Sequence, residues 1–150
     1  MNRILFNVDI LARILAIDYG IKRCGIAITD EMQIIASGLD TIPTKEIFSF
    51  LTSYLENENV ETFVVGEPKQ MDNSVSESHE IIETFVSKLK TTFPKIPVER
   101  IDERFTSKMA FQSMIAGGLK KKKRQNKALI DQVSATIILQ SFMERRNSSF

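Results

Sequence analysis

The sequence predicts a single α/β domain in which a mixed β-sheet is flanked by helices, and three observations support this. The chain has 150 residues, 43% hydrophobic and 26% charged, which suits one globular domain with a substantial core. Its first part holds short apolar runs separated by turns, as in antiparallel hairpins. In its second part strands alternate with amphipathic helices, which implies crossover connections.

The first half of the chain predicts three strands, a helix and a fourth strand. Residues 14–18 and 25–29 are apolar runs separated by a short turn, and they predict an antiparallel hairpin. A third strand is expected around residues 34–42. Thr44 can cap the helix that follows, and the β-branched run at residues 62–66 predicts the next strand.

The second half predicts three helices and the last strand. Ser74 begins a capping-box pattern, which is typical of a helix start, and Pro94 ends that helix. Residues 98–101 predict a short strand, and Thr106 can cap a third helix. A last helix is expected after Asn126. The predicted order is therefore β-β-β-α-β-α-β-α-α.

Composition excludes several kinds of protein. The chain has one cysteine and one histidine, so it can form no internal disulfide and offers no Cys/His zinc cluster. No apolar run approaches the ~20 residues of a membrane span. We therefore expect a cytoplasmic protein without a membrane partner. Residues 1–13 are interpreted as an N-terminal extension, 14–146 as the domain and 147–150 as a C-terminal tail.

Charge is unevenly distributed along the chain. Residues 1–119 carry 12 Lys/Arg and 17 Asp/Glu, whereas residues 120–150 carry 8 and 2. Such a split indicates a segment that binds a polyanion such as nucleic acid, although a solvated basic loop is the alternative. The candidate nucleic-acid contacts are Lys120, Lys121, Lys122, Lys123, Arg124 and Lys127, together with Lys22 and Arg23 after the first strand.

Acidic residues end the first and last predicted strands. Asp18 lies on the same strand face as Ile14 and Ala16. Asp102 and Glu103 are neighbours and point to opposite faces, so only one of them can enter a shared site, and spacing does not say which. Taken singly, each acid is explained at least as well by a solvated strand end.

Asp131 is the most informative acid. It lies in the second turn of the last predicted helix, past the positions where an acid caps a helix or favours its dipole. Ala135, Ile138 and Phe142 follow at i+4, i+7 and i+11, which places Asp131 on the face turned toward the sheet. A carboxylate there needs a salt bridge or a metal ion, and the pattern leaves both open.

Metal-dependent phosphodiester chemistry would account for these acids together. Two Mg²⁺ or Mn²⁺ ions about 3.5–4 Å apart can activate an attacking water and stabilise the leaving oxygen. Such hard ions prefer carboxylate oxygens and do not require His or Cys. The sequence therefore predicts a metal-dependent nuclease.

Four segments carry recognisable motifs. They are IDYGIKRCGIA at 17–27, VGEP at 65–68 with MDNS at 71–74, DERFTS at 102–107, and DQVSA at 131–135. In this order they resemble the opening hairpin, the Gly-x-Pro…Met-Asp-Gly loop, the Asp-Glu-Arg segment and the final helix of the YqgF-type family. Members of that family are described as pre-16S rRNA nucleases and as Holliday-junction-resolvase-like proteins.

The resemblance implies a ribonuclease-H-like fold, a five-stranded mixed sheet whose first three strands are antiparallel. It implies a nuclease that matures the 5′ end of 16S rRNA, with structured RNA and ribosomal particles as partners and two Mg²⁺ or Mn²⁺ ions as cofactors. It assigns the catalytic and metal positions to Asp18, Glu103 and Asp131, with Asp102 in reserve. Glu67 departs from the family pattern, and we expect it to be solvated.

Other functions stay open at this point. A junction-specific endonuclease would cut branched DNA, and a non-catalytic factor would bind RNA or the ribosome through the basic segment alone. A nucleotide-binding ATPase is a fourth interpretation, but it would need two such domains. The sequence shows no aromatic platform for single strands, and it marks no dimer interface, so it fits a monomer or a dimer.

Overall fold

The computed structural model describes residues 11–67, 79–102 and 127–148. In these ranges one sheet has the strand order β3-β2-β1-β4-β5. Its strands are β1 (Arg13–Asp18), β2 (Arg23–Thr29), β3 (Ala36–Pro43), β4 (Val60–Glu67) and β5 (Val98–Asp102). The first three are antiparallel neighbours, whereas β4 is parallel to β1 and β5 to β4. The predicted mixed sheet with an antiparallel first half is confirmed.

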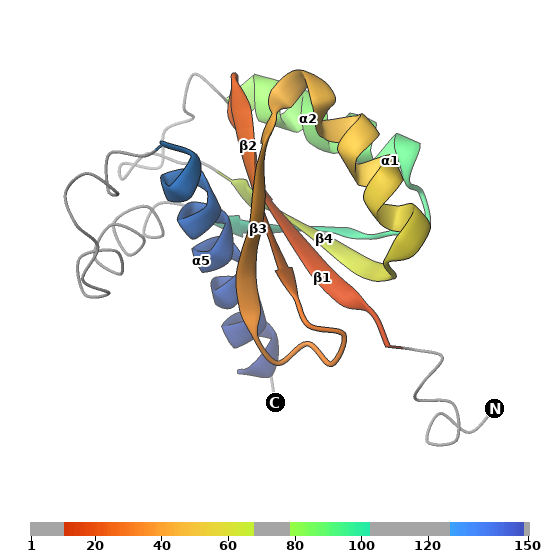
Figure 1. Ribbon diagram of the computed structural model, residues 1–150, viewed down its shortest axis with the longest axis vertical. Coiled ribbons are helices and arrows are strands. Elements are labelled where there is room, and N and C mark those ends of the chain that lie inside the picture. The colour runs from red at the N-terminus through yellow and green to blue at the C-terminus, as the bar shows by residue number, and fades with distance from the viewer. Residues whose placement is uncertain (1–10, 68–78, 103–126, 149–150) are drawn as a thin grey trace.

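Helices cover both faces of the sheet (Figure 1). Helices α1 (Ile47–Asn57) and α2 (His79–Thr92) lie on one face, and α5 (Lys127–Asn147) lies on the other. Because successive strand residues point to opposite faces, β1 contributes Leu15 and Ile17 to the core beneath α1 and α2. It contributes Ile14 and Ala16 to the core beneath α5. We call these two sides the α1/α2 face and the α5 face.

The start of α1 differs from the prediction. Thr44 does not cap the helix but begins a 3₁₀ turn, Thr44–Glu46, and α1 follows at Ile47. The hydroxyl of Thr44 instead donates a hydrogen bond to the carbonyl oxygen of Gly20 at 2.6 Å. This bond ties the start of α1 to the turn after β1, so a long-range partner takes the place of the expected local one.

The first strand and the last helix begin within one residue of the predicted positions. β1 begins at Arg13, and α5 begins at Lys127, directly after the predicted cap position. The predicted capping box at Ser74 and the predicted third helix from Thr106 lie outside the described residues. None of the helices in the described ranges is long and apolar enough to cross a membrane.

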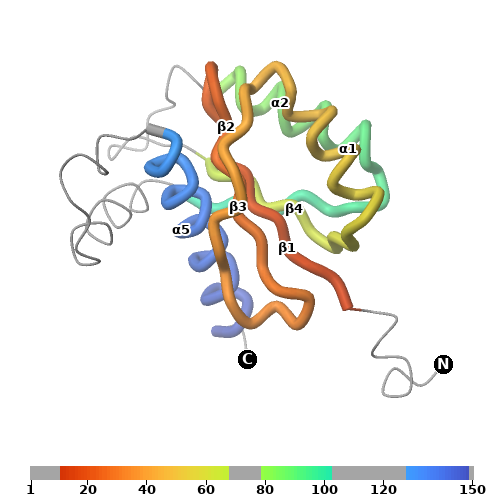
Figure 2. The backbone as a smooth tube through the Cα atoms, in the orientation of Figure 1, coloured from red at the N-terminus to blue at the C-terminus, as the bar shows by residue number. Residues whose placement is uncertain are grey.

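Helix α5 approaches the sheet closely at Gly25 of β2. A Cβ atom at this position would overlap the backbone carbonyl of Asp131 and lie 3.1 Å from the Asp131 Cβ. Figure 2 shows α5 alongside β2 and β3. Glycine is therefore required for the first turns of α5 to rest against β2.

We expect Gly25→Ala to destabilise the protein by about 1–3 kcal/mol, because the added methyl group must displace helix backbone. Gly38→Ala is the matched control on β3, since the atom nearest to a Cβ there would be the Gln132 Cβ at 3.2 Å, which a shift of a few tenths of an ångström relieves, whereas no such shift accommodates the overlap at Gly25. Urea unfolding measures both. Equal stabilities for the two variants would contradict this account of the contact.

Candidate active site

Asp18 lies at the end of β1 on the α5 face. It follows Ile14 and Ala16, which are fully buried in the core beneath α5, and strand alternation directs its side chain the same way. In the antiparallel register Asp18 lies opposite Gly25. Paired Cα atoms in such a ladder are about 4.5–5.5 Å apart, so Asp18 is a close neighbour of the point where α5 meets the sheet.

Asp131 reaches the same point from α5. Ala135, Ile138 and Phe142 are buried against the sheet, which confirms the predicted helix face. The backbone of Asp131 packs on Gly25, the cross-strand neighbour of Asp18. Two acids from distant parts of the sequence are therefore both neighbours of Gly25.

The charges of both acids affect the pKa of the Cys24 thiol. Burial raises its pKa, a hydrogen bond with Thr44 opposes that rise, and the negative charges of Asp18 and Asp131 add to it. Both carboxylates thus interact electrostatically with one β2 side chain. The raised pKa keeps the thiol protonated at neutral pH, so Cys24 is a core residue and not a nucleophile.

Asp131 is paired with Arg23 at the start of β2. The guanidinium Nε of Arg23 donates to Asp131 Oδ2 at 2.5 Å, and the two side chains are 36% and 22% exposed. The sequence left a salt bridge or a metal ion open for Asp131, and the structure contains the salt bridge. We expected Arg23 to contact nucleic acid, and the structure places it on Asp131, whereas Lys22 is exposed.

Asp102 lies on the other face. Its neighbour Ile101 belongs to the core beneath α5, so Asp102 shares the α1/α2 face with Arg100. Arg100 donates to Glu83 of α2 at 2.7 Å and lies 4.0 Å from Glu67. The arrangement disfavours Asp102 as a partner of the two acids on the α5 face. Glu67, which we expected to be solvated, takes part in this ion network instead.

The remaining predicted site residues are not described. Glu103, Lys120, Lys121, Lys122, Lys123 and Arg124 lie outside the described residues, and Lys127 is the first residue of α5. Within the described ranges no group of three or more His, Cys, Asp or Glu could hold a metal ion. Of the three predicted ligands, Asp18 and Asp131 lie in the described part of the chain.

The chemistry of the pair fits an oxygen-ligated divalent cation. Both donors are carboxylates, the groups that Mg²⁺ and Mn²⁺ prefer. Asp131 already accepts a positive group, because the Arg23 guanidinium bonds one of its oxygens. A cation at Asp131 would have to share the carboxylate with Arg23 or displace it.

A double-mutant cycle shows whether the ion pair serves stability. We expect Arg23→Met and Asp131→Asn to be coupled by less than about 1 kcal/mol, because both side chains retain solvent contact. Chemical unfolding of the two single variants and the double variant gives this energy. A coupling of about 3 kcal/mol or more would mark a structural lock and would contradict a role for the pair in function.

Comparisons with known sequences agree on one family. A family model described as "RuvX: Holliday junction resolvase" matches residues 12–145. A Flavobacterium psychrophilum protein named "Putative pre-16S rRNA nuclease" is 62% identical over 136 residues, 91% of this chain and 99% of the relative. A Bacteroides fragilis protein of the same name is 57% identical over the same shares.

A solved structure supports the fold. The structure described as T. thermophilus RuvC in complex with Holliday junction substrate matches with a TM-score of 0.54 and 19% identity. The match covers 90% of this chain and 96% of that chain. At this identity the likeness concerns the fold alone, and it confirms the predicted ribonuclease-H-like architecture.

Proposed function

The chain belongs to the RuvX family, as its motifs indicated, and from this premise we propose that it is a nuclease that hydrolyses phosphodiester bonds in pre-16S rRNA. Relatives with that name align over nearly their whole length. The observation that carries the proposal is that Asp18 and the backbone of Asp131 are both neighbours of Gly25. A bacterial rRNA-processing enzyme of this kind works in the cytoplasm, among ribosomal particles.

The proposed metal ligands are Asp18, Asp131 and Glu103. The position of Asp102 on the α1/α2 face supports its exclusion and leaves Glu103 as the acid contributed by that segment. Mg²⁺ or Mn²⁺, in the proposed number of two, would supply Lewis-acid chemistry for the attack of water on phosphorus. The protein's own contribution is to fix the carboxylates before substrate arrives.

Arg23 is proposed to orient Asp131. Its guanidinium holds one carboxylate oxygen, which restricts the Asp131 side chain near the start of α5. If a cation shared Asp131, Arg23 would keep N–H groups beside the carboxylate that could donate elsewhere. Planar guanidinium groups bind phosphate well, so Arg23 can then serve the substrate backbone as we first expected.

Removing either described acid should abolish cleavage. We expect Asp18→Asn and Asp131→Asn to lower kcat on a pre-16S rRNA fragment by at least about 10²-fold, beyond the loss typical of outer-shell partners. Cleavage should require Mg²⁺ or Mn²⁺ and stop with EDTA. Gel assays at saturating metal measure each rate.

Asp102→Asn is the matched control, because it removes a strand-end carboxylate of the same kind from the opposite face. We expect its rate to stay close to that of the unmodified protein. If Asp18→Asn retained full activity, the proposed mechanism would be wrong. If Asp102→Asn were as inactive as Asp131→Asn, the assignment of the faces would fail.

Branched DNA is the competing substrate class, because the matching family is described as Holliday junction resolvases. A four-way DNA junction and an rRNA-precursor fragment of equal length separate the two activities. Faster cleavage of the junction, with paired cuts, would replace RNA by DNA in the proposal. The acidic site would be unchanged.

The basic residues at 120–124 are proposed to grip the phosphate backbone. Their sequence holds five consecutive positive charges, K-K-K-K-R, a few residues before Asp131. We expect replacement of Lys121 and Lys122 by Ser to weaken RNA binding at low salt. The slope of log Kd against log salt should also fall, by up to about 0.9 for each lost phosphate contact on a duplex. Filter binding at several salt concentrations measures this.

The matched control replaces Lys90 of α2 and Lys95 just after it, which are both exposed and lie outside the basic segment, and so removes the same charge. A slope that falls equally in both double variants would show that net charge, and not the basic segment, governs binding.

A further inference from the structure

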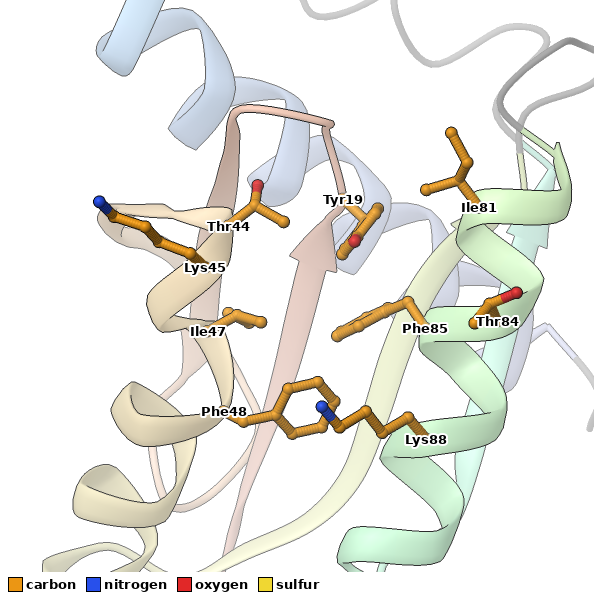
Figure 3. A pocket seen from close by; sticks show the side chains of 9 residues that line it. All are labelled: Tyr19, Thr44, Lys45, Ile47, Phe48, Ile81, Thr84, Phe85 and Lys88. Carbon is orange, nitrogen blue, oxygen red and sulfur yellow. The ribbon is translucent and has the colours of Figure 1, made fainter.

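A cavity opens on the α1/α2 face, beside the end of β1. Its volume is about 460 Å³, within the ~300–1,000 Å³ of small-ligand sites. Figure 3 shows its wall built from α1 on one side, α2 on the other and Tyr19 between them. The nuclease chemistry proposed above uses none of the residues that line it.

Three aromatic rings from separate segments form much of this cavity. Tyr19 and Phe85 are stacked with ring centroids 4.3 Å apart, and Phe48 meets Phe85 at 5.5 Å. Phe85 is buried against Tyr19, so the half-buried rings of Tyr19 and Phe48 supply the aromatic surface that a ligand in the cavity can contact. Exposed aromatic surface of this kind is the usual platform for unpaired nucleobases.

The cavity also has positive charge. Lys88 extends across it, with its Nζ 4.6 Å from the centroid of the Phe48 ring (Figure 3), and Lys45 lies at its rim. Of the described residues that line it, none is acidic. A ligand that combines an aromatic ring with negative charge fits this lining, and a nucleotide has both.

We propose that this cavity binds one unpaired nucleotide of the nucleic-acid substrate next to the bond that is cut. The proposal rests on the proposed nuclease function and deepens it, because it adds a requirement for a single-stranded position beside the cleavage site. Its geometric basis is that Asp18 and Tyr19 are consecutive residues whose side chains enter opposite faces of the sheet.

That adjacency places the cavity directly beside Asp18. The Cα atoms of Asp18 and Tyr19 are about 3.8 Å apart, so one strand crossing this edge can present a phosphate to the α5 face and the next base to the cavity. The bond from Thr44 to Gly20 keeps the rim of the cavity fixed to the same turn. Substrate with an unpaired nucleotide beside the cut is then preferred over continuous duplex.

The test uses the full chain and an RNA duplex that carries one unpaired 2-aminopurine at its end, in EDTA so that no cleavage occurs. Stacking of 2-aminopurine on an aromatic ring quenches its fluorescence. We expect binding of the unmodified protein to quench it, and a blunt duplex of equal length to bind more weakly.

Two matched pairs of variants locate the effect. Phe48→Leu removes a ring of the cavity while keeping its bulk, and Phe50→Leu does the same on the far side of α1, where Phe50 stacks on Tyr54. Lys88→Glu reverses a charge of the cavity, and Lys90→Glu reverses an exposed charge of α2 outside it. We expect the two cavity variants to weaken RNA binding about fivefold or more, as for the loss of one stacked base, and to abolish the quenching. The two control variants should bind and quench like the unmodified protein.

Each result decides the proposal. Quenching that survives in both cavity variants, or that falls equally in their controls, overturns it. An absence of quenching with unmodified protein also overturns it and leaves an apolar protein segment as the occupant. If Phe48→Leu does not fold, Lys88→Glu at an exposed position still decides. If the protein quenches fully but never cleaves with Mn²⁺, only the proposed nuclease function is wrong. If it cleaves without a preference for the unpaired nucleotide, only the role of the cavity is wrong.

Discussion

The packing of the α5 backbone on Gly25 is the constraint on which the site depends. The carbonyl of Asp131 occupies the space that any side chain at position 25 would need. Apolar residues further along α5 hold the helix on the sheet, but this contact sets how near its first turns come to β1. Because Gly25 is the cross-strand neighbour of Asp18, one small residue determines whether two carboxylates can act together.

The sheet separates an acidic site on one face from an aromatic, positively charged cavity on the other. On the α5 face, Asp18 and Asp131 gather negative charge that Arg23 partly balances. On the α1/α2 face, directly after Asp18, Tyr19 turns into a cavity with aromatic and positively charged walls. Asp18 is the last residue of β1, and Tyr19, the next residue, packs against Phe85 of α2 on the opposite face. Hydrolysis and substrate selection can therefore rest on adjacent positions without competing for space.

Local periodicity explains what the sequence could predict, and long-range pairing explains what it could not. The period of two in β1 and the helical period after Asp131 predicted which apolar residues pack beneath α5, and the structure confirms this for Ile14, Ala16, Ala135, Ile138 and Phe142. Spacing left open which acid of the last strand is suited to the site, because the answer depends on how β5 sits in the sheet. The ion pair of Arg23 and the aromatic cavity are each formed by segments far apart in the chain, so no local sequence pattern predicts them.

A crystal soaked with Mn²⁺ and measured at a wavelength where manganese scatters anomalously tests the central claim most directly. We expect an anomalous peak from a manganese ion bound by oxygens of Asp18 and Asp131. The guanidinium of Arg23 should have moved away from the Asp131 oxygen that it bonds. Manganese bound elsewhere, with the oxygens of these two side chains directed into different regions, would contradict the account.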